Sequence, residues 1–152
     1  MIPKLVVLDI AGTTVNDFGL VQKAAMNTMK EKLAVDVTLD DANKVMGIPK
    51  KTAFEQLCSL HQVEVSAEQI DGLVFHFNDR LTAQYAEKGS IELMPHAGEL
   101  FESIRACGSQ VYLNTGLNRA IADVIVQNLN LGNVLNGYIG SDEVMAGRPQ
   151  PD

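Results

Sequence analysis

The stretch Leu5-Val6-Val7-Leu8-Asp9-Ile10-Ala11-Gly12-Thr13-Thr14 decides how the rest of the chain is interpreted. Its four apolar residues run without alternation, which predicts a short strand buried on both faces, as in parallel α/β sheets. Gly12 allows a tight turn just after the strand. Asp9 then stands at the carboxyl end of the strand, where open α/β sheets bind their ligands. A carboxylate there can act as a nucleophile, hold a metal ion, or only cap the turn.

The composition is that of an ordinary globular protein, with 46% hydrophobic and 20% charged residues. The net charge of -7, from 12 basic and 19 acidic residues, disfavours nucleic acid or an anionic membrane as the main partner. No apolar run is long enough to span a bilayer, and the N-terminus lacks the pattern of a signal peptide. Cys58 and Cys107 are far apart, which favours free thiols in a reducing compartment over a metal site. We therefore expect a cytoplasmic protein.

Between about residues 19 and 92 the hydrophobic pattern is almost purely helical. Ser66-Ala67-Glu68-Gln69 has the form of a capping box, and an apolar stripe follows it as far as Tyr85. An alternating α/β pattern then resumes, with a strand at Val111–Thr115, a helix that Asn118 can cap, and a short strand at Tyr138–Ser141. The predicted order is a strand, a helical insertion, and then helix, strand, helix and strand.

The segment Asp9–Thr14 reads Asp-x-Ala-Gly-Thr-Thr and resembles the first motif of the haloacid dehalogenase-like (HAD) hydrolase superfamily. Most phosphatases of that superfamily carry a second aspartate, the general acid, where this chain has Ala11. The present form is similar to the branch that contains phosphonoacetaldehyde hydrolase (phosphonatase) and phosphonatase-like proteins. The resemblance implies an α/β fold, with a Rossmann-like core of parallel strands in residues 1–18 and 93–152. It also implies an inserted α-helical cap in residues 19–92, with hinges at 16–19 and 92–96.

The same resemblance implies roles for individual residues. Asp9 would be the nucleophile, forming an aspartyl-phosphate, and Mg²⁺ would contact Asp9 and the carbonyl of Ala11. Arginine offers a fixed fork of donors to phosphate oxygens, and Arg148 lies in Gly-Arg-Pro-Gln-Pro, which matches the Gly-Arg-Pro-x-Pro form seen in phosphonatases. The expected phosphate- or substrate-binding residues are Thr13, Thr115, Gly116 and Arg148.

Lys50 ends Met-Gly-Ile-Pro-Lys, which matches the Met-Gly-x-x-Lys pattern of phosphonatase caps. In those enzymes the lysine forms an imine with the substrate aldehyde, since cleaving a P–C bond requires an electron sink on carbon. A lowered lysine pKa would need burial or nearby positive charge, to which Lys51 could contribute. Phosphonatases carry a histidine three positions later, where this chain has Ala53. We therefore favour phosphate or substrate binding by Lys50 over imine formation, and keep both as catalytic roles.

The fourth HAD motif, one or two aspartates that hold Mg²⁺ after a fourth strand, is missing before Asp152. Without that strand Leu5–Leu8 would form an open apolar edge, so we expect the chain to be truncated at its C-terminus. The expected function is a Mg²⁺-dependent, phosphonatase-like hydrolase of a small phosphonate or phosphate substrate. The alternatives are an ordinary HAD phosphatase or phosphomutase, or an inactive truncated fragment. A homodimer through the cap remains open.

Overall fold

The computed structural model describes residues 2–148. Met1 and Pro149–Asp152, the end of the predicted core and of its Gly-Arg-Pro-x-Pro segment, lie outside the described residues. The elements follow one another in the order β1 (Leu5–Asp9), β2 (Val15–Asn16), α1 (Leu20–Leu33), α2 (Leu39–Lys44), α3 (Lys50–Leu60), α4 (Ala67–Ala86), β3 (Glu92–Leu93), α5 (Ala97–Ala106), β4 (Gln110–Asn114), α6 (Arg119–Asn128), the short 3-10 helix η1 (Leu131–Asn133) and β5 (Gly137–Ile139).

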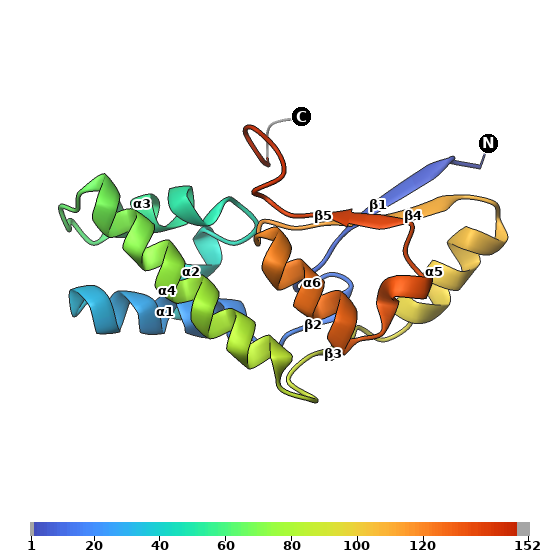
Figure 1. Cartoon of the computed structure of the whole chain (residues 1–152). Helices are drawn as coiled ribbons and strands as arrows, with labels where there is room; N and C mark the ends of the chain where they lie inside the picture. Colours follow the sequence, from blue (N-terminus) through green and yellow to red (C-terminus); the bar gives the residue numbers. More distant parts are fainter. Residues whose placement is uncertain (1, 149–152) are drawn as a thin grey trace.

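Three of the strands form a parallel sheet in the order β1-β4-β5 (Figure 1). Val6 pairs with Val111 and Leu8 with Leu113, and the helices α5 and α6 pack over the face of the sheet on which these side chains lie. Val111 and Leu113 are fully buried there. The predicted α/β class with a parallel sheet is therefore confirmed.

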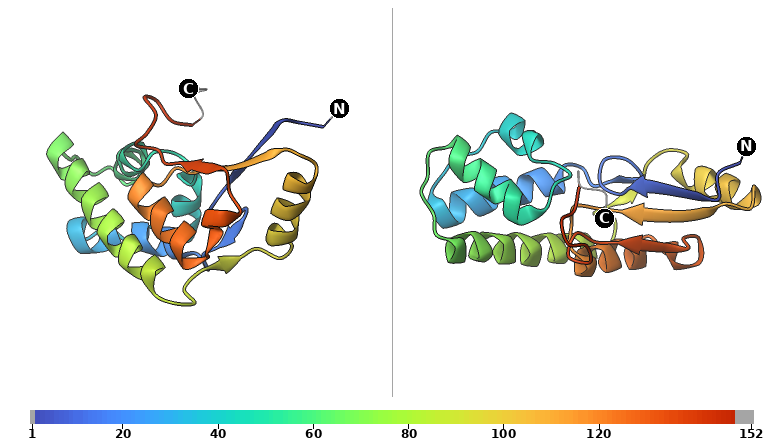
Figure 2. Two further views of the ribbon diagram at one scale, coloured as in Figure 1. Left: turned by 45° about the vertical axis from the view of Figure 1, so that its right-hand side comes forward. Right: turned by 90° about the horizontal axis from the view of Figure 1, so that it is seen from above.

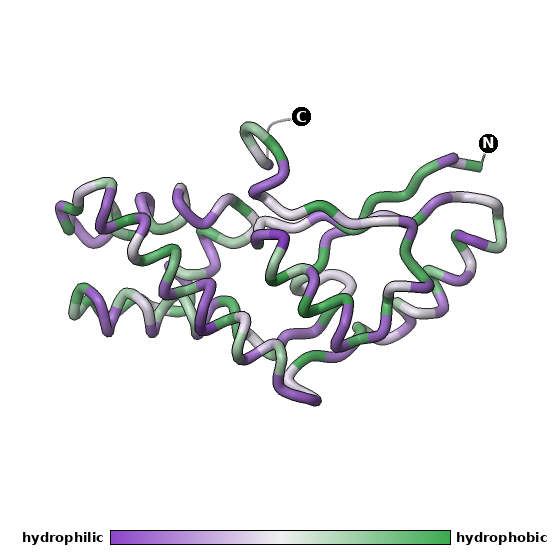
Figure 3. Tube along the Cα trace, in the orientation of Figure 1, coloured by the Kyte–Doolittle hydropathy of each residue, from purple (hydrophilic) through white to green (hydrophobic). Residues whose placement is uncertain are grey.

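The prediction that the first strand is buried on both faces is wrong. Leu5 and Val7 are each 49% exposed, although the trace of β1 is strongly apolar (Figure 3). Parallel strands that follow one another in the same direction across a sheet, joined by right-handed connections, place both connecting helices on one face. Within residues 2–148 the other face therefore lacks a helical layer, and β1 forms an edge of the sheet.

The interval between β2 and β3 contains the four helices α1 to α4, which pack together beside the sheet (Figure 2). The predicted capping box of α4 is confirmed, because Ser66 accepts from the N–H of Gln69 and the Gln69 side chain accepts from the N–H of Ser66. Phe54 of α3 meets Phe77 of α4 edge to face, at 5.8 Å between ring centres. In the described part of the chain no helix is both long enough and apolar enough to cross a membrane.

The chain passes from the sheet layer into the helical interval and returns from it at one place, where β2 and β3 lie side by side. Val15 pairs with Leu93 and Asn16 with Glu92, so that β2 and β3 form a two-stranded antiparallel ribbon. This ribbon supports a division into a core, residues 1–18 and 93–152, and a helical cap, residues 19–92, which we keep as a proposal.

A buried group of polar side chains lies next to the ribbon. Asp17 accepts hydrogen bonds from the N–H groups of Gly19 and Val21 and from the hydroxyl of Tyr85, at the end of α4. Asn128 of α6 donates to the carbonyl oxygens of Tyr85 and Glu87. The two helices α4 and α6 are thereby joined at their C-terminal ends.

Candidate active site

Asp9 is the last residue of β1, and a tight turn follows it. The carbonyl of Ile10 accepts from the N–H groups of Thr13, Thr14 and Val15, and Gly12 has a φ of +79°, which favours glycine. The buried hydroxyl of Thr14 donates to the carbonyl of Asp9 at 2.8 Å. The turn thus fixes the backbone of Asp9 and leaves its half-buried carboxylate at the carboxyl end of the strand.

Arg148 reaches this carboxylate from the loop that follows β5. Its Nη1 donates to Oδ1 of Asp9 at 2.6 Å, a charge-assisted hydrogen bond. The start of that loop is fastened to α6, because Arg119 pairs with Glu143 and the N–H of Arg119 donates to Asp142. A cation and the candidate nucleophile are therefore in contact although 139 positions separate them in sequence.

Lys50 begins α3 and approaches the same place from the helical interval. Its ammonium lies 5.5 Å from the centre of the Phe77 ring, a cation–π arrangement. Burial and, secondarily, the positive charge of Arg148 lower the pKa of Lys50 to about 8, while Asp9 opposes the shift. The expected contribution of Lys51 is not seen, because the exposed Lys51 pairs with Asp71, 2.8 Å away.

Thr115 and Gly116 follow β4 directly. Thr115 is buried, and its Oγ1 accepts from the N–H of Leu117 at 3.1 Å, which leaves the hydroxyl hydrogen free to be donated. A cleft of about 20 Å³ lies between these residues and the helices, and its lining residues are Asp9, Ala11, Val21, Met46, Gly47, Lys50, Thr115, Gly116, Leu117 and Arg148.

The structure thus brings together most of the residues singled out in the sequence, but not all. Thr13 is exposed and is not among the residues that line the cleft, so its phosphate-binding role stays a prediction. The apolar walls Val21, Met46 and Leu117 and the ring of Phe77 were not anticipated as parts of a site. In the sequence these residues are recognisable only as apolar, and this property does not distinguish them from residues of the hydrophobic core.

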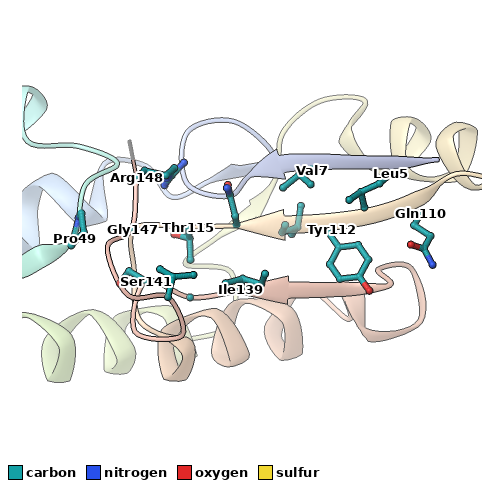
Figure 4. A pocket seen from close by; sticks show the side chains of 15 residues that line it. Leu5, Val7, Pro49, Gln110, Tyr112, Thr115, Ile139, Ser141, Gly147 and Arg148 are labelled. Carbon is teal, nitrogen blue, oxygen red and sulfur yellow. The ribbon is translucent and has the colours of Figure 1, made fainter. Parts of the chain in front are cut away.

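A second, larger hollow lies on the uncovered face of the sheet, with a volume of about 530 Å³ (Figure 4). Leu5 and Val7 of β1, Tyr112 of β4 and Ile139 of β5 form its floor. Thr115, Gly116 and Arg148 line both this hollow and the small cleft. The candidate site therefore adjoins the hollow on the bare face of the sheet.

Over residues 2–148 no group of three or more histidine, cysteine, aspartate or glutamate side chains could hold a metal ion. Asp9 and Ala11 nevertheless line the same cleft, where a carboxylate and a backbone carbonyl are available. Oxygen ligands of this kind suit Mg²⁺, which commonly takes one or two protein carboxylates and completes its shell with water and phosphate oxygens. The described residues therefore fit part of a magnesium site.

A parallel sheet with a carboxylate at the end of its first strand and basic residues facing it is the arrangement that the sequence led us to expect for the HAD class. The family model for haloacid dehalogenase-like hydrolases matches residues 6–152, and the chain belongs to this family.

Two curated relatives share 27% identity with the chain over 97% of its length. One is a bifunctional phosphonoacetaldehyde hydrolase/aminoethylphosphonate transaminase of Clostridioides difficile, and the other is a phosphonoacetaldehyde hydrolase-like protein of Syntrophobacter fumaroxidans. The chain spans 25% of the first relative and 57% of the second.

Solved structures agree with this fold. A phosphonoacetaldehyde hydrolase-like protein from Oleispira antarctica superposes with a TM-score of 0.84 and 25% identity, covering 100% of this chain and 58% of that one. A predicted phosphoglycolate phosphatase from Haemophilus somnus has a TM-score of 0.78 at 17% identity, covering 97% of this chain and 67% of that one, which is a likeness of fold alone.

Proposed function

We propose that the chain carries the nucleophile and the phosphate-binding groups of a phosphonatase-like hydrolase that acts on a small phosphonate or phosphate. One observation carries this proposal. Asp9, Lys50, Thr115 and Arg148 come from four separate segments and line a single cleft at the carboxyl ends of β1 and β4. Ligands of open α/β sheets bind at such a position.

The roles follow from the chemistry of the side chains. A carboxylate oxygen of Asp9 attacks phosphorus, the bond from phosphorus to the leaving group breaks, and an aspartyl-phosphate forms that water then hydrolyses. Arg148 has five N–H donors and uses one of them on Asp9, so others can bind phosphoryl oxygens. The hydroxyl of Thr115 can donate to another phosphoryl oxygen.

The proposed cofactor is Mg²⁺, held by the carboxylate of Asp9 and the carbonyl oxygen of Ala11. When bound, the ion would neutralise negative charge on the phosphoryl group and on the attacking carboxylate. The contact between Arg148 and Asp9 supplies part of that neutralisation from the chain itself.

The names of the two curated relatives favour a small phosphonate over a phosphate ester. Ala11 agrees with this, because it leaves no carboxylic acid two positions after Asp9 to protonate an alkoxide leaving group. Lys50 binds the substrate from the side of the helices. The lowered pKa of Lys50 would also serve the alternative role, imine formation, because only the neutral amine attacks a carbonyl carbon.

We further propose that the protein works in the cytoplasm. Cys58 and Cys107 are both free thiols, one buried and one exposed, as suits a reducing compartment.

The decisive experiment compares Asp9→Asn with the unchanged protein, both assayed in the presence of Mg²⁺. Phosphate release is measured from phosphonoacetaldehyde and from a panel of small phosphate monoesters. We expect Asp9→Asn to lower turnover on the order of 10⁴-fold, as the loss of a catalytic nucleophile or its partner does. Asp40→Asn, an exposed carboxylate of α2, is the control and should keep full activity. Activity of Asp9→Asn close to that of the control would overturn the proposal.

A further inference from the structure

Two glycines of the sheet layer face the loop that carries Lys50. A Cβ atom on Gly116, just after β4, would lie 2.9 Å from the carbonyl carbon and oxygen of Gly47 and 3.0 Å from the carbonyl oxygen of Ile48. A Cβ atom on Gly147, beside Arg148, would lie 2.9 Å from Cγ of Pro49. Gly147 and Pro49 are neighbours at one end of the hollow in Figure 4.

These separations leave no room for a side chain. Carbon atoms that are not bonded attract one another best at about 3.5–4.0 Å, so a contact below 3 Å forces one partner to move. At Gly116 the partner is backbone, which cannot rotate away as the end of a side chain can. The φ of Gly116 lies outside the left-handed region, so its own backbone does not require glycine there. The close approach of residues 47 and 48 is what requires it.

Among the glycines, only these two make such close contacts with the loop that carries Lys50. The still closer contacts at Gly137 and Gly140 are with Tyr112 of β4 and with Asn118 and Arg119 at the start of α6. A Cβ atom on Gly132 or on Gly72 would meet nothing within 4 Å, and neither residue has a positive φ. Gly116 and Gly147 instead belong to the two loops that supply Thr115 and Arg148 to the cleft. The tightest packing between the sheet layer and the Lys50 loop therefore lies next to the candidate phosphate-binding residues.

We propose that Gly116 and Gly147 act as a seat for residues 47–49, and that they are positioning residues which set how far Lys50 enters the cleft. This assigns to Gly116 a role different from the phosphate binding expected from the sequence. The proposal rests on the proposed function only for what Lys50 does once it is in place. The packing of the loop on the two glycines can be tested without measuring enzymatic activity.

Oxidation of methionine by hydroxyl radicals reports the position of the loop, since Met46 precedes the seated residues and lines the cleft. Two other methionines calibrate the reaction: Met145 is 99% exposed and Met29 is fully buried. We expect Gly116→Ala to raise the oxidation rate of Met46 at least about fivefold relative to Met145, with Met29 still protected. Gly132→Ala, where the added methyl group has open space, should leave the rate unchanged. An unchanged rate at Met46 in folded Gly116→Ala would overturn the proposal.

Oxidation of Met29 would show that Gly116→Ala does not fold. In that case a second set of variants tests whether the glycines position the loop. Gly147→Ala suffers both the clash with Pro49 and the strain of its own φ of +62°. The double variant Gly147→Ala/Pro49→Ala keeps that strain but removes Cγ of Pro49. If the two glycines hold residues 47–49 in place, Met46 should be oxidised faster in Gly147→Ala than in the unchanged protein. In the double variant the oxidation rate of Met46 should fall most of the way to the rate measured in Pro49→Ala. Equal rates in the Gly147→Ala single and the double variant would contradict the proposal.

Discussion

The charge of Lys50 is determined by its neighbours in space. Burial and the guanidinium of Arg148 both disfavour the ammonium form and lower its pKa to about 8, from an ordinary value of 10.5. Lys51, one residue away, pairs with Asp71 at the surface, and this ion pair raises the pKa of Lys51. Two adjacent lysines therefore have opposite shifts, and only Lys50 has an appreciable neutral fraction near pH 8.

This difference predicts how stability depends on pH. Between about pH 8 and 10.5 the unfolded chain holds a proton on Lys50 that the folded chain has lost, so the contribution of Lys50 to the free energy of unfolding rises with pH. Lys50→Met removes this term. The variant should be more stable than the unchanged protein at pH 7, and the difference should narrow as the pH approaches 10.5. Urea unfolding at several pH values measures the difference in the free energy of unfolding between the variant and the unchanged protein. For Lys51→Met this difference should not narrow over the same pH range.

The chemistry of Lys50 can be decided by trapping. Imine formation predicts that borohydride traps a covalent adduct of phosphonoacetaldehyde on Lys50, found by mass spectrometry, and that Lys50→Arg abolishes turnover, because a guanidinium cannot form the imine. Binding alone predicts no adduct and partial activity of Lys50→Arg. We expect binding alone, since Ala53 stands where phosphonatases have a histidine. A trapped adduct at Lys50 would reverse this assignment.

Among the elements, α4 is held to the rest of the molecule by polar contacts at its C-terminal end. Tyr85 is fully buried, and its hydroxyl donates to Asp17 at 2.9 Å. Asp17 also accepts from the N–H groups of Gly19 and Val21, so one carboxylate connects the start of α1 with the end of α4. The bonds from Asn128 then attach the same end of α4 to α6.

Tyr85→Phe should lower the free energy of unfolding by about 1–2 kcal/mol, because a buried carboxylate loses one of its donors while the ring volume is kept. Denaturant unfolding measures the change. Tyr112→Phe is the matched control, since the ring of Tyr112 lies at the open face of the sheet. A loss of stability in Tyr85→Phe no greater than in this control would show that the contact with Asp17 contributes nothing.

At the level of elements the sequence was a good guide where the signal is local. The capping box at Ser66 and the cap at Asn118, whose side chain accepts from the N–H of Ile121, were both predicted and are both confirmed. Such caps join residues two or three positions apart, so the pattern that encodes them is visible in sequence. The bond between Tyr85 and Asp17 spans 68 positions, and no periodic pattern reports it.

Across the whole molecule the main departure from expectation is the bare face of the sheet. Leu5, Val7 and Ile139 are each more than 40% exposed there. The position of β1 at the edge of the sheet, among the described residues, agrees with the expectation for a chain without the fourth strand. The run of apolar residues correctly predicted a parallel sheet. It could not show which face the helices cover, because that depends on the order and handedness of the connections.

An exposed apolar edge strand promotes association between chains. We expect the 152-residue chain to associate increasingly with concentration, and Val7→Lys to reduce that association by placing a charge on the face. Phe75→Ser serves as the control, since Phe75 is 75% exposed on α4, where a homodimer through the cap would form. Sedimentation velocity at several concentrations measures both variants. A reduction by Phe75→Ser and none by Val7→Lys would place the contact on the helices instead.

The candidate site was predicted as a set of residues but not as an arrangement. The motif around Asp9 and the patterns at Lys50 and Arg148 identified three residues that line one cleft. The contact of Gly116 with Gly47 and the source of the shift at Lys50 depend on how segments far apart in sequence pack. Conversely, membership of a sequence motif does not ensure a place in the site: Thr13 belongs to the first motif but does not line the cleft.

The ribbon of β2 and β3 has a consequence for the order in which the chain folds. The pairing of β1 with β4 joins Leu5 to Gln110 and must close a loop of roughly a hundred residues. The hydrogen bonds within helices α1 to α4 are local and develop early, and the packing of α1 against α4 then brings Val15 next to Leu93. Once Val15 and Leu93 are paired, the loop that remains to be closed is about a quarter as long, which lowers its closure cost by roughly 1 kcal/mol. Amide protons of α1–α4 should therefore gain protection before those of the sheet when refolding is followed by pulsed hydrogen exchange, and the interval that interrupts the sheet in sequence would also speed its assembly.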